Sequence, residues 1–82
     1  MKNRIKAHLI KMSDSRGRDK TFCPSEVARE LFKEDQWRSQ MDLIRSLADE
    51  LVAEGQLVVM QKNKPIAVKP SEAVGPIRLR KK

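Results

Sequence analysis

The sequence is poor in the residues that build disulfides, metal centres and catalytic clusters. Its 82 residues include one cysteine, Cys23, one histidine, His8, and no tyrosine. One cysteine cannot close an internal disulfide, and it cannot complete a four-ligand zinc site with a single histidine. The three glycines are far apart, so they form no glycine-rich phosphate loop. We therefore expect a cytoplasmic protein that is not an enzyme, with no metal, no cofactor and no small-molecule substrate. The roles of Cys23 and His8 stay open.

Aromatic residues and long apolar runs are also scarce. Phe22, Phe32 and Trp37 are the whole aromatic set, too few for a platform on which several bases stack. No apolar run approaches the roughly 20 residues of a membrane-spanning helix. Basic side chains interrupt the apolar residues near the N-terminus, unlike in a secretory signal. The 39% hydrophobic content suffices for one small core, so we expect a single domain over residues 1–82 and no membrane partner.

Positive charge is what the sequence has in excess, at +7 overall. Residues 1–20 hold seven basic and two acidic side chains, a net +5, and residues 61–82 hold seven basic and one acidic, a net +6. Residues 21–60 are acidic, with four basic and eight acidic side chains and a net −4. Basic proteins of this kind bind polyanions such as nucleic acid, although solvated basic ends without any such partner give the same pattern.

Apolar residues recur at helical spacing in three segments. The first, residues 2–13, ends in a cluster of serine, aspartate and glycine. The second, residues 24–32, begins with Pro24, which suits the first position of a helix. The third, residues 36–54, has the clearest helical period and ends at Gly55. The side chains expected in the core are those of Ile5, Leu9, Met12, Val27, Ala28, Leu31, Phe32, Trp37, Met41, Ile44, Leu47, Ala48, Leu51 and Val52.

Extended segments follow the third helix. Residues 57–61 are apolar and partly β-branched, and a polar turn separates them from an expected partner strand at residues 65–69. Residues 76–80 alternate apolar and basic, as an edge strand with one wet face does. A brief extended piece is expected at Thr21–Phe22, before the second helix. This order predicts an α+β fold of the winged-helix type, a three-helix helix-turn-helix core with a C-terminal β-hairpin wing.

Three motifs in the chain resemble a small bacterial family of winged-helix domains of unknown function. They are the hexapeptide at residues 24–29, Trp37–Arg38 followed by Met41 and Arg45, and the hexapeptide at residues 75–80. The resemblance covers most of the chain and is weakest in its first quarter. It implies a fold, and it implies no activity because the family has none established.

The third helix and the wing are the parts of a winged helix that meet DNA. On the helix, the candidate contacts are Arg38, Ser39 and Arg45, although its second half is acidic and has the wrong charge for phosphate. On the wing and tail, the candidates are Lys62, Asn63, Lys64, Lys69, Arg78 and Arg80. Plain solvation explains each lysine equally well, since charged hairpin tips are common and prevent edge pairing.

Two classes of function therefore stay open. The first is a DNA-binding or regulatory domain that contacts the phosphates of double-stranded DNA with its wing and tail. The second is a protein-interaction module that binds another protein or a second copy of itself, because its acidic middle and basic ends are complementary. Fold alone does not decide between the two classes.

Overall fold

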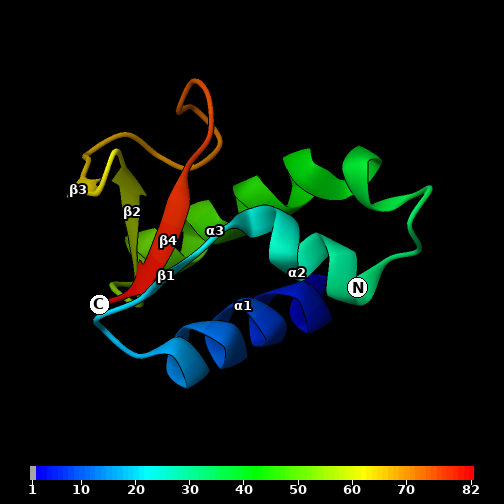
Figure 1. Cartoon of the computed structure of the whole chain (residues 1–82), viewed down its shortest axis with the longest axis horizontal. Helices are drawn as coiled ribbons and strands as arrows, with labels where there is room; N and C mark the ends of the chain where they lie inside the picture. Colours follow the sequence, from blue (N-terminus) through cyan, green and yellow to red (C-terminus); the bar gives the residue numbers. More distant parts are fainter. Residues whose placement is uncertain (1) are drawn as a thin grey trace.

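The computed structural model describes residues 2–82, which form three α-helices, one short 3₁₀ helix and a four-stranded antiparallel sheet (Figure 1). The helices are α1 (Lys2–Arg16), α2 (Pro24–Leu31), the 3₁₀ helix η1 (Trp37–Gln40) and α3 (Met41–Ala53). The strands are β1 (Thr21–Phe22), β2 (Leu57–Gln61), β3 (Lys64–Pro65) and β4 (Arg78–Lys81). The expected α+β class is confirmed, and the arrangement is compatible with a winged-helix-like fold.

The sheet has one face on the helices and one face away from them. Its strand order is β1–β4–β2–β3, with every neighbouring pair antiparallel. Phe22, Leu79 and Val59 lie opposite one another across three strands and are buried. Because side chains alternate between the faces of a strand, the residues next to these form a second row on the outer face. That outer face carries Thr21, Val58, Met60, Arg78 and Arg80.

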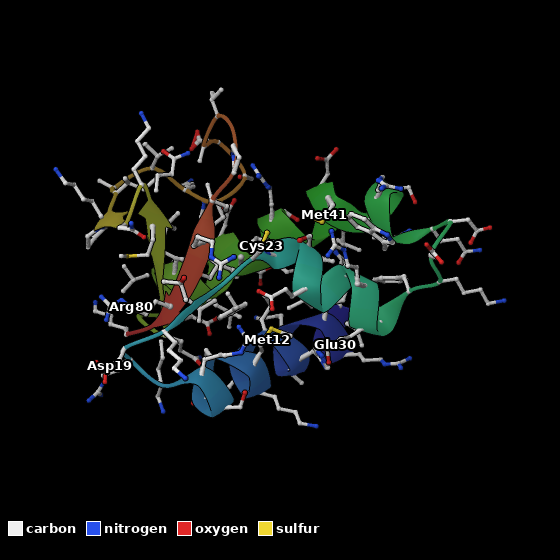
Figure 2. The ribbon with its side chains drawn as sticks, in the orientation of Figure 1. Met12, Asp19, Cys23, Glu30, Met41 and Arg80 are labelled. Carbon is white, nitrogen blue, oxygen red and sulfur yellow. The ribbon has the colours of Figure 1, made fainter. Side chains whose placement is uncertain are left out.

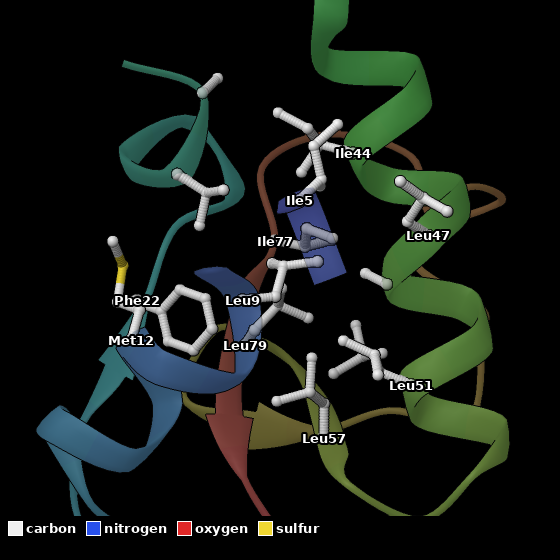
Figure 3. Packing of buried hydrophobic residues seen from close by; sticks show 14 of the residues in the cluster. Ile5, Leu9, Met12, Phe22, Ile44, Leu47, Leu51, Leu57, Ile77 and Leu79 are labelled. Atoms are coloured by element: carbon white, nitrogen blue, oxygen red, sulfur yellow. The ribbon is translucent and has the colours of Figure 1, made fainter. Parts of the chain in front are cut away.

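One hydrophobic cluster joins the three helices to the sheet (Figure 3). α1 contributes Ile5 and Leu9, and α3 contributes Ile44 and Leu51. All four side chains are fully buried, as the helical spacing predicts. Burial of each side chain of this size stabilises the fold by about 1.5–3 kcal/mol. The cluster therefore fixes α3, β2 and β4 relative to one another.

Helix α1 continues beyond Ser13, where the sequence predicts its end. The Oγ of Ser13 donates a hydrogen bond to the carbonyl of Ile10 at 2.8 Å, and Ser15 Oγ donates to that of Met12 at 3.2 Å. These bonds let both serines remain helical. The helix ends instead at Arg16, and the next residue, Gly17, has a φ of +77°, in the left-handed region that glycine adopts without strain.

The predicted third helix, residues 36–54, consists of η1 and α3. The N–H groups of Gln36 and Trp37 both donate to the carbonyl of Lys33, at 2.8 and 3.0 Å. This turn leads the chain into the tighter 3₁₀ geometry before α3 begins. As a result Trp37, expected in the core, is half-buried at its margin. The other expected core residues found partly buried at the margin are Leu31, Phe32, Met41 and Val52.

Strand β2 occupies the residues predicted for it, but its partner strand is shorter than the predicted residues 65–69 and begins one residue earlier. Lys62 and Asn63 have φ values of +50° and +64° and form a two-residue turn. Pairing therefore starts at once, and β3 consists only of Lys64–Pro65. The N–H of Ile66 still donates to the carbonyl of Val59 at 2.9 Å, but β3 ends at Pro65 and residues 66–77 form a loop.

Strand β4 lies inside the sheet, whereas the sequence predicts an edge strand at residues 76–80. It pairs with β1 on one side and with β2 on the other. The predicted alternation is correct, since Ile77 and Leu79 are buried and Arg78 is exposed. Alternation indicates one wet face, but it does not determine how many strands lie beside the segment.

Candidate nucleic-acid interface

The tip of the β2–β3 hairpin carries three of the predicted contact residues. Lys62, Asn63 and Lys64 are exposed. Within residues 2–82, neither lysine forms an ion pair or a side-chain hydrogen bond. Lys69 follows in the loop and is exposed as well. The tip therefore presents ammonium groups that have no carboxylate partner in the described part of the chain.

The outer face of the sheet carries the next two predicted residues, Arg78 and Arg80. Arg78 donates from Nε to Thr21 Oγ1 at 3.0 Å and from Nη2 to the Thr21 carbonyl at 3.1 Å. Arg80 donates from Nη1 to the carbonyl of Arg18 at 3.2 Å, beside the turn that carries Asp19 (Figure 2). Because these acceptors are neutral, they orient the two guanidinium groups without cancelling their charge.

The loop of residues 66–77 lies along one flank of helix α3 and engages the side chains there. Arg45 donates from Nη1 to the Ala73 carbonyl at 3.2 Å and from Nη2 to the Gly75 carbonyl at 3.1 Å. One turn further on, the carboxylate of Asp49 accepts the N–H of Ser71 at 2.9 Å and also its hydroxyl. Arg45, a predicted contact residue, is therefore engaged within the protein.

The other side of α3 is engaged with α1. Lys6 lies 3.3 Å from Glu50 and 3.5 Å from Glu54. The hydrogen bond with Glu50 raises the pKa of the Lys6 ammonium. Between these two flanks, the exposed part of α3 includes Asp42 and Ser46, neither of which is basic. Phosphate contacts along α3 are therefore not favoured by its charge.

The remaining two predicted residues, Arg38 and Ser39, lie in η1. Ser39 Oγ donates to the carbonyl of Gln36 at 2.8 Å. Figure 1 shows that η1 and β3 lie at opposite ends of the longest axis of the molecule. The predicted contact residues of the hairpin and of β4 therefore belong to one sheet, whereas Arg38 and Ser39 in η1 lie apart from that sheet.

A group around Trp37 is one that sequence reasoning missed. The guanidinium carbons of Arg29 and Arg38 lie 4.7 and 4.6 Å from the centroid of the Trp37 ring. These residues and Glu34 line an open recess of about 490 Å³. Periodicity does not reveal this group, because Arg29 reaches Trp37 only when the link between α2 and η1 turns the chain back.

Cys23 and His8 take part in local polar contacts. Cys23 precedes α2, is half-buried, and its Sγ accepts a hydrogen bond from Ser25 Oγ at 3.0 Å. His8 Nε2 lies 3.1 Å from Glu30 Oε1 and joins α1 to α2. Over residues 2–82, no group of three or more histidine, cysteine, aspartate or glutamate side chains is placed to hold a metal ion.

Comparison with known proteins places the chain in a family. No curated protein matches it. None of the helices described for residues 2–82 has the length and apolar character needed to cross a membrane. The profile of one family covers residues 2–82, and its description is "Protein of unknown function (DUF3253)". The expected membership in a family of unknown function is confirmed, while the match carries no winged-helix assignment. The chain belongs to the DUF3253 family.

Proposed function

We propose that this protein is a non-enzymatic nucleic-acid-binding domain that contacts the phosphates of double-stranded DNA with the β2–β3 tip and the outer face of the sheet. The observation that carries the proposal is the unbalanced charge of these two surfaces. Lys62, Lys64 and Lys69 have no ion-pair partner within residues 2–82, and Arg78 and Arg80 bond only to neutral groups there.

The acidic side chains support this view, because many of them are used elsewhere. The carboxylates paired with a basic group or histidine among the described residues are Glu26 with Arg16, Glu30 with His8, Glu50 and Glu54 with Lys6, and Asp14 with Lys81. Basic side chains on the hairpin and on the outer face of the sheet therefore have no ion-pair partner within residues 2–82. Phosphate contacts of this kind position a protein on DNA without reading its sequence. The single free cysteine, Cys23, favours a reducing compartment such as the cytoplasm.

Fluorescence anisotropy with a random-sequence duplex tests the proposal. If four to six basic side chains contact phosphates, the logarithm of the binding constant falls with the logarithm of salt at a slope of about −3.5 to −5.5. Between about 50 and 200 mM salt, affinity then falls at least about a hundredfold. We expect the triple change of Lys62, Lys64 and Lys69 to alanine to weaken binding strongly, and Arg38→Ala to weaken it less.

A charge-matched variant provides the control. Changing Lys2, Lys11 and Lys33 to alanine also removes three positive charges from exposed side chains, outside the hairpin. We expect this variant to keep most of the affinity. Equal losses in the two triple variants would show that net charge alone attracts the duplex. An absence of binding at the lower salt concentration would reject the proposal.

A protein-binding role is the second candidate, and the loop of residues 66–77 favours it. Val74 is 91% exposed and Val68 is 47% exposed, and both lie in this loop. Exposed apolar side chains can contribute to a surface that a protein partner covers. Sedimentation of the chain alone and with a duplex separates the two candidates. Self-association that Val74→Ser abolishes, without any duplex binding, would favour the second.

A further inference from the structure

The group around Trp37 brings two positive charges to one aromatic ring. Arg29 belongs to α2, whereas Trp37 and Arg38 belong to η1. Their guanidinium carbons lie 4.7 and 4.6 Å from the ring centroid, within the range of cation–π attraction. Both arginines also line one recess beside the ring, so a single ligand bound there can contact both.

The hydrogen-bond donors of these two arginines remain available. Neither Arg29 nor Arg38 forms an ion pair or a side-chain hydrogen bond within the described residues. A guanidinium group that stacks on an aromatic face keeps its N–H groups at its edge. Stacking on Trp37 also limits the freedom of both side chains, which lowers the entropic cost of binding a ligand.

We propose that Arg29, Trp37 and Arg38 form a binding site for a phosphoryl group. Guanidinium groups bind phosphate in a bidentate manner, with charge-assisted hydrogen bonds. A phosphoryl group offers three acceptor oxygens and up to two negative charges, which two guanidinium groups can share. The recess of about 490 Å³ beside the ring has room for a phosphoryl group and part of the molecule that carries it.

Glu34 sets a limit on the charge of the site. Its carboxylate lines the same recess, so the site holds two positive charges and one negative charge. The carboxylate repels an anion, and we expect its removal to strengthen phosphate binding. A change at Glu34 and a change at either arginine should therefore shift the affinity in opposite directions.

Trp37 itself provides the probe, because it is the only tryptophan in the chain. Inorganic phosphate is titrated while the indole fluorescence and the indole N–H resonance are recorded, with sodium chloride at matched ionic strength as the reference. We expect a saturable response to phosphate with a dissociation constant of about 1 mM or lower. A response no larger than that to chloride would overturn the proposal.

Substitutions assign the response to the site. Arg29→Gln and Arg38→Gln should each weaken phosphate binding about tenfold or more, and Glu34→Gln should tighten it. Lys33→Gln is the matched control, because it removes a neighbouring positive charge while the backbone carbonyl of Lys33 still holds the turn before η1. A response that persists in both arginine variants would reject the assignment.

A second measurement applies if either glutamine variant fails to fold. Chemical shifts of the wild-type amides then locate the phosphate. Changes centred on Arg29, Trp37 and Arg38 support the site, and changes centred on the β2–β3 hairpin reject it.

Two sources of the phosphoryl group are distinguished by using matched oligonucleotides. A single strand with a 5′-phosphate and the same strand with a 5′-hydroxyl are compared with inorganic phosphate. Tighter binding of the phosphorylated strand assigns the site to nucleic-acid ends, and equal behaviour of the two strands assigns it to free phosphate compounds. The site is separate from the hairpin lysines, so its failure would leave the duplex titration of the proposed function unaffected.

Discussion

Glu26 joins two helices through one carboxylate. Its Oε1 accepts a hydrogen bond from Arg16 Nη2 at 2.7 Å, and its Oε2 accepts the backbone N–H of Cys23 at 2.7 Å. Burial raises the pKa of Glu26, but the hydrogen bonds from Arg16 and Cys23, together with the positive charges of Arg16 and Arg78, outweigh burial and lower the pKa from its ordinary value of 4.5. The ionised form is thus the one that the folded protein stabilises.

This carboxylate makes stability depend on pH. Because the folded-state pKa lies below the unfolded value, Glu26 stabilises the fold above about pH 4.5, and this stabilisation is lost as pH falls through the folded-state pKa. We expect Glu26→Gln to cost about 1 kcal/mol near pH 7. It should also flatten the fall in stability at acid pH. Urea unfolding over a pH series measures both effects.

Glu30→Gln serves as the control for this effect, because Glu30 is exposed and contacts only His8 among the described residues. We expect it to keep the acid sensitivity of the wild type. If Glu26→Gln keeps that sensitivity as well, another carboxylate is responsible.

Trp37 and Phe22 differ in their burial and in the contacts that hold their side chains in place. Phe22 is fully buried, whereas Trp37 is half-buried and held partly by two arginines. Phe22→Ala is therefore expected to cost about 3–5 kcal/mol, and Trp37→Ala about 1–2 kcal/mol, from partial burial and cation–π contact. Chemical denaturation compares the two variants. If the two substitutions lower the free energy of unfolding equally, Trp37 belongs to the core, as its helical spacing alone predicts.

At the scale of elements, the loop of residues 66–77 depends on α3 for its position. Asp49 accepts the N–H of Ser71, and Arg45 donates to the carbonyls of Ala73 and Gly75. Gln61 Nε2 donates to the carbonyl of Val74 at 2.9 Å and ties the same loop to β2. The loop is therefore held from both α3 and β2.

Asp49→Ala should release one of these attachments. Because the Ser71 N–H loses its acceptor, we expect its hydrogen exchange to accelerate about tenfold, equivalent to one hydrogen bond of about 1.4 kcal/mol. Exchange measured by NMR reads this amide directly. Asp42→Ala, at an exposed position of the same helix, should leave it unchanged. An unaltered Ser71 amide in Asp49→Ala would show that other contacts hold the loop.

The interior of the elements could be predicted from the sequence better than their ends. Ile5, Leu9, Ile44 and Leu51 are buried as their spacing predicts, because burial along a helix follows a local period. Ends depend on single hydrogen bonds instead. Ser13 remains in α1 because its hydroxyl bonds the backbone within the helix, an outcome that its turn-forming tendency does not predict.

At the scale of the whole molecule, some basic side chains form ion pairs within the protein and others do not. Carboxylates pair with Lys6, Arg16 and Lys81, while the hairpin lysines remain without partners in residues 2–82. The net charge of +7 is therefore distributed unevenly over the surface. The steep salt dependence expected for duplex binding follows from this distribution rather than from any single residue.

Only part of the candidate site could be predicted from the sequence alone. Lys62, Asn63 and Lys64 lie at a hairpin tip as predicted, because the turn that carries them is a local feature. Arg45 and Asp49, which the helical period assigns to a solvent flank, instead hold a loop more than 20 residues away. The contact of Arg29 with Trp37 is likewise absent from any local pattern.

The sequence by itself determined the α+β class, the buried faces of the helices, the position of β2 and the excess of positive charge. Each of these depends on composition or on spacing within one segment. The tertiary structure alone decided that β4 lies between β1 and β2, that a loop contacts one flank of α3, and that two arginines meet one tryptophan. These features join residues that are distant in the chain, and only the packing of the whole core brings them together.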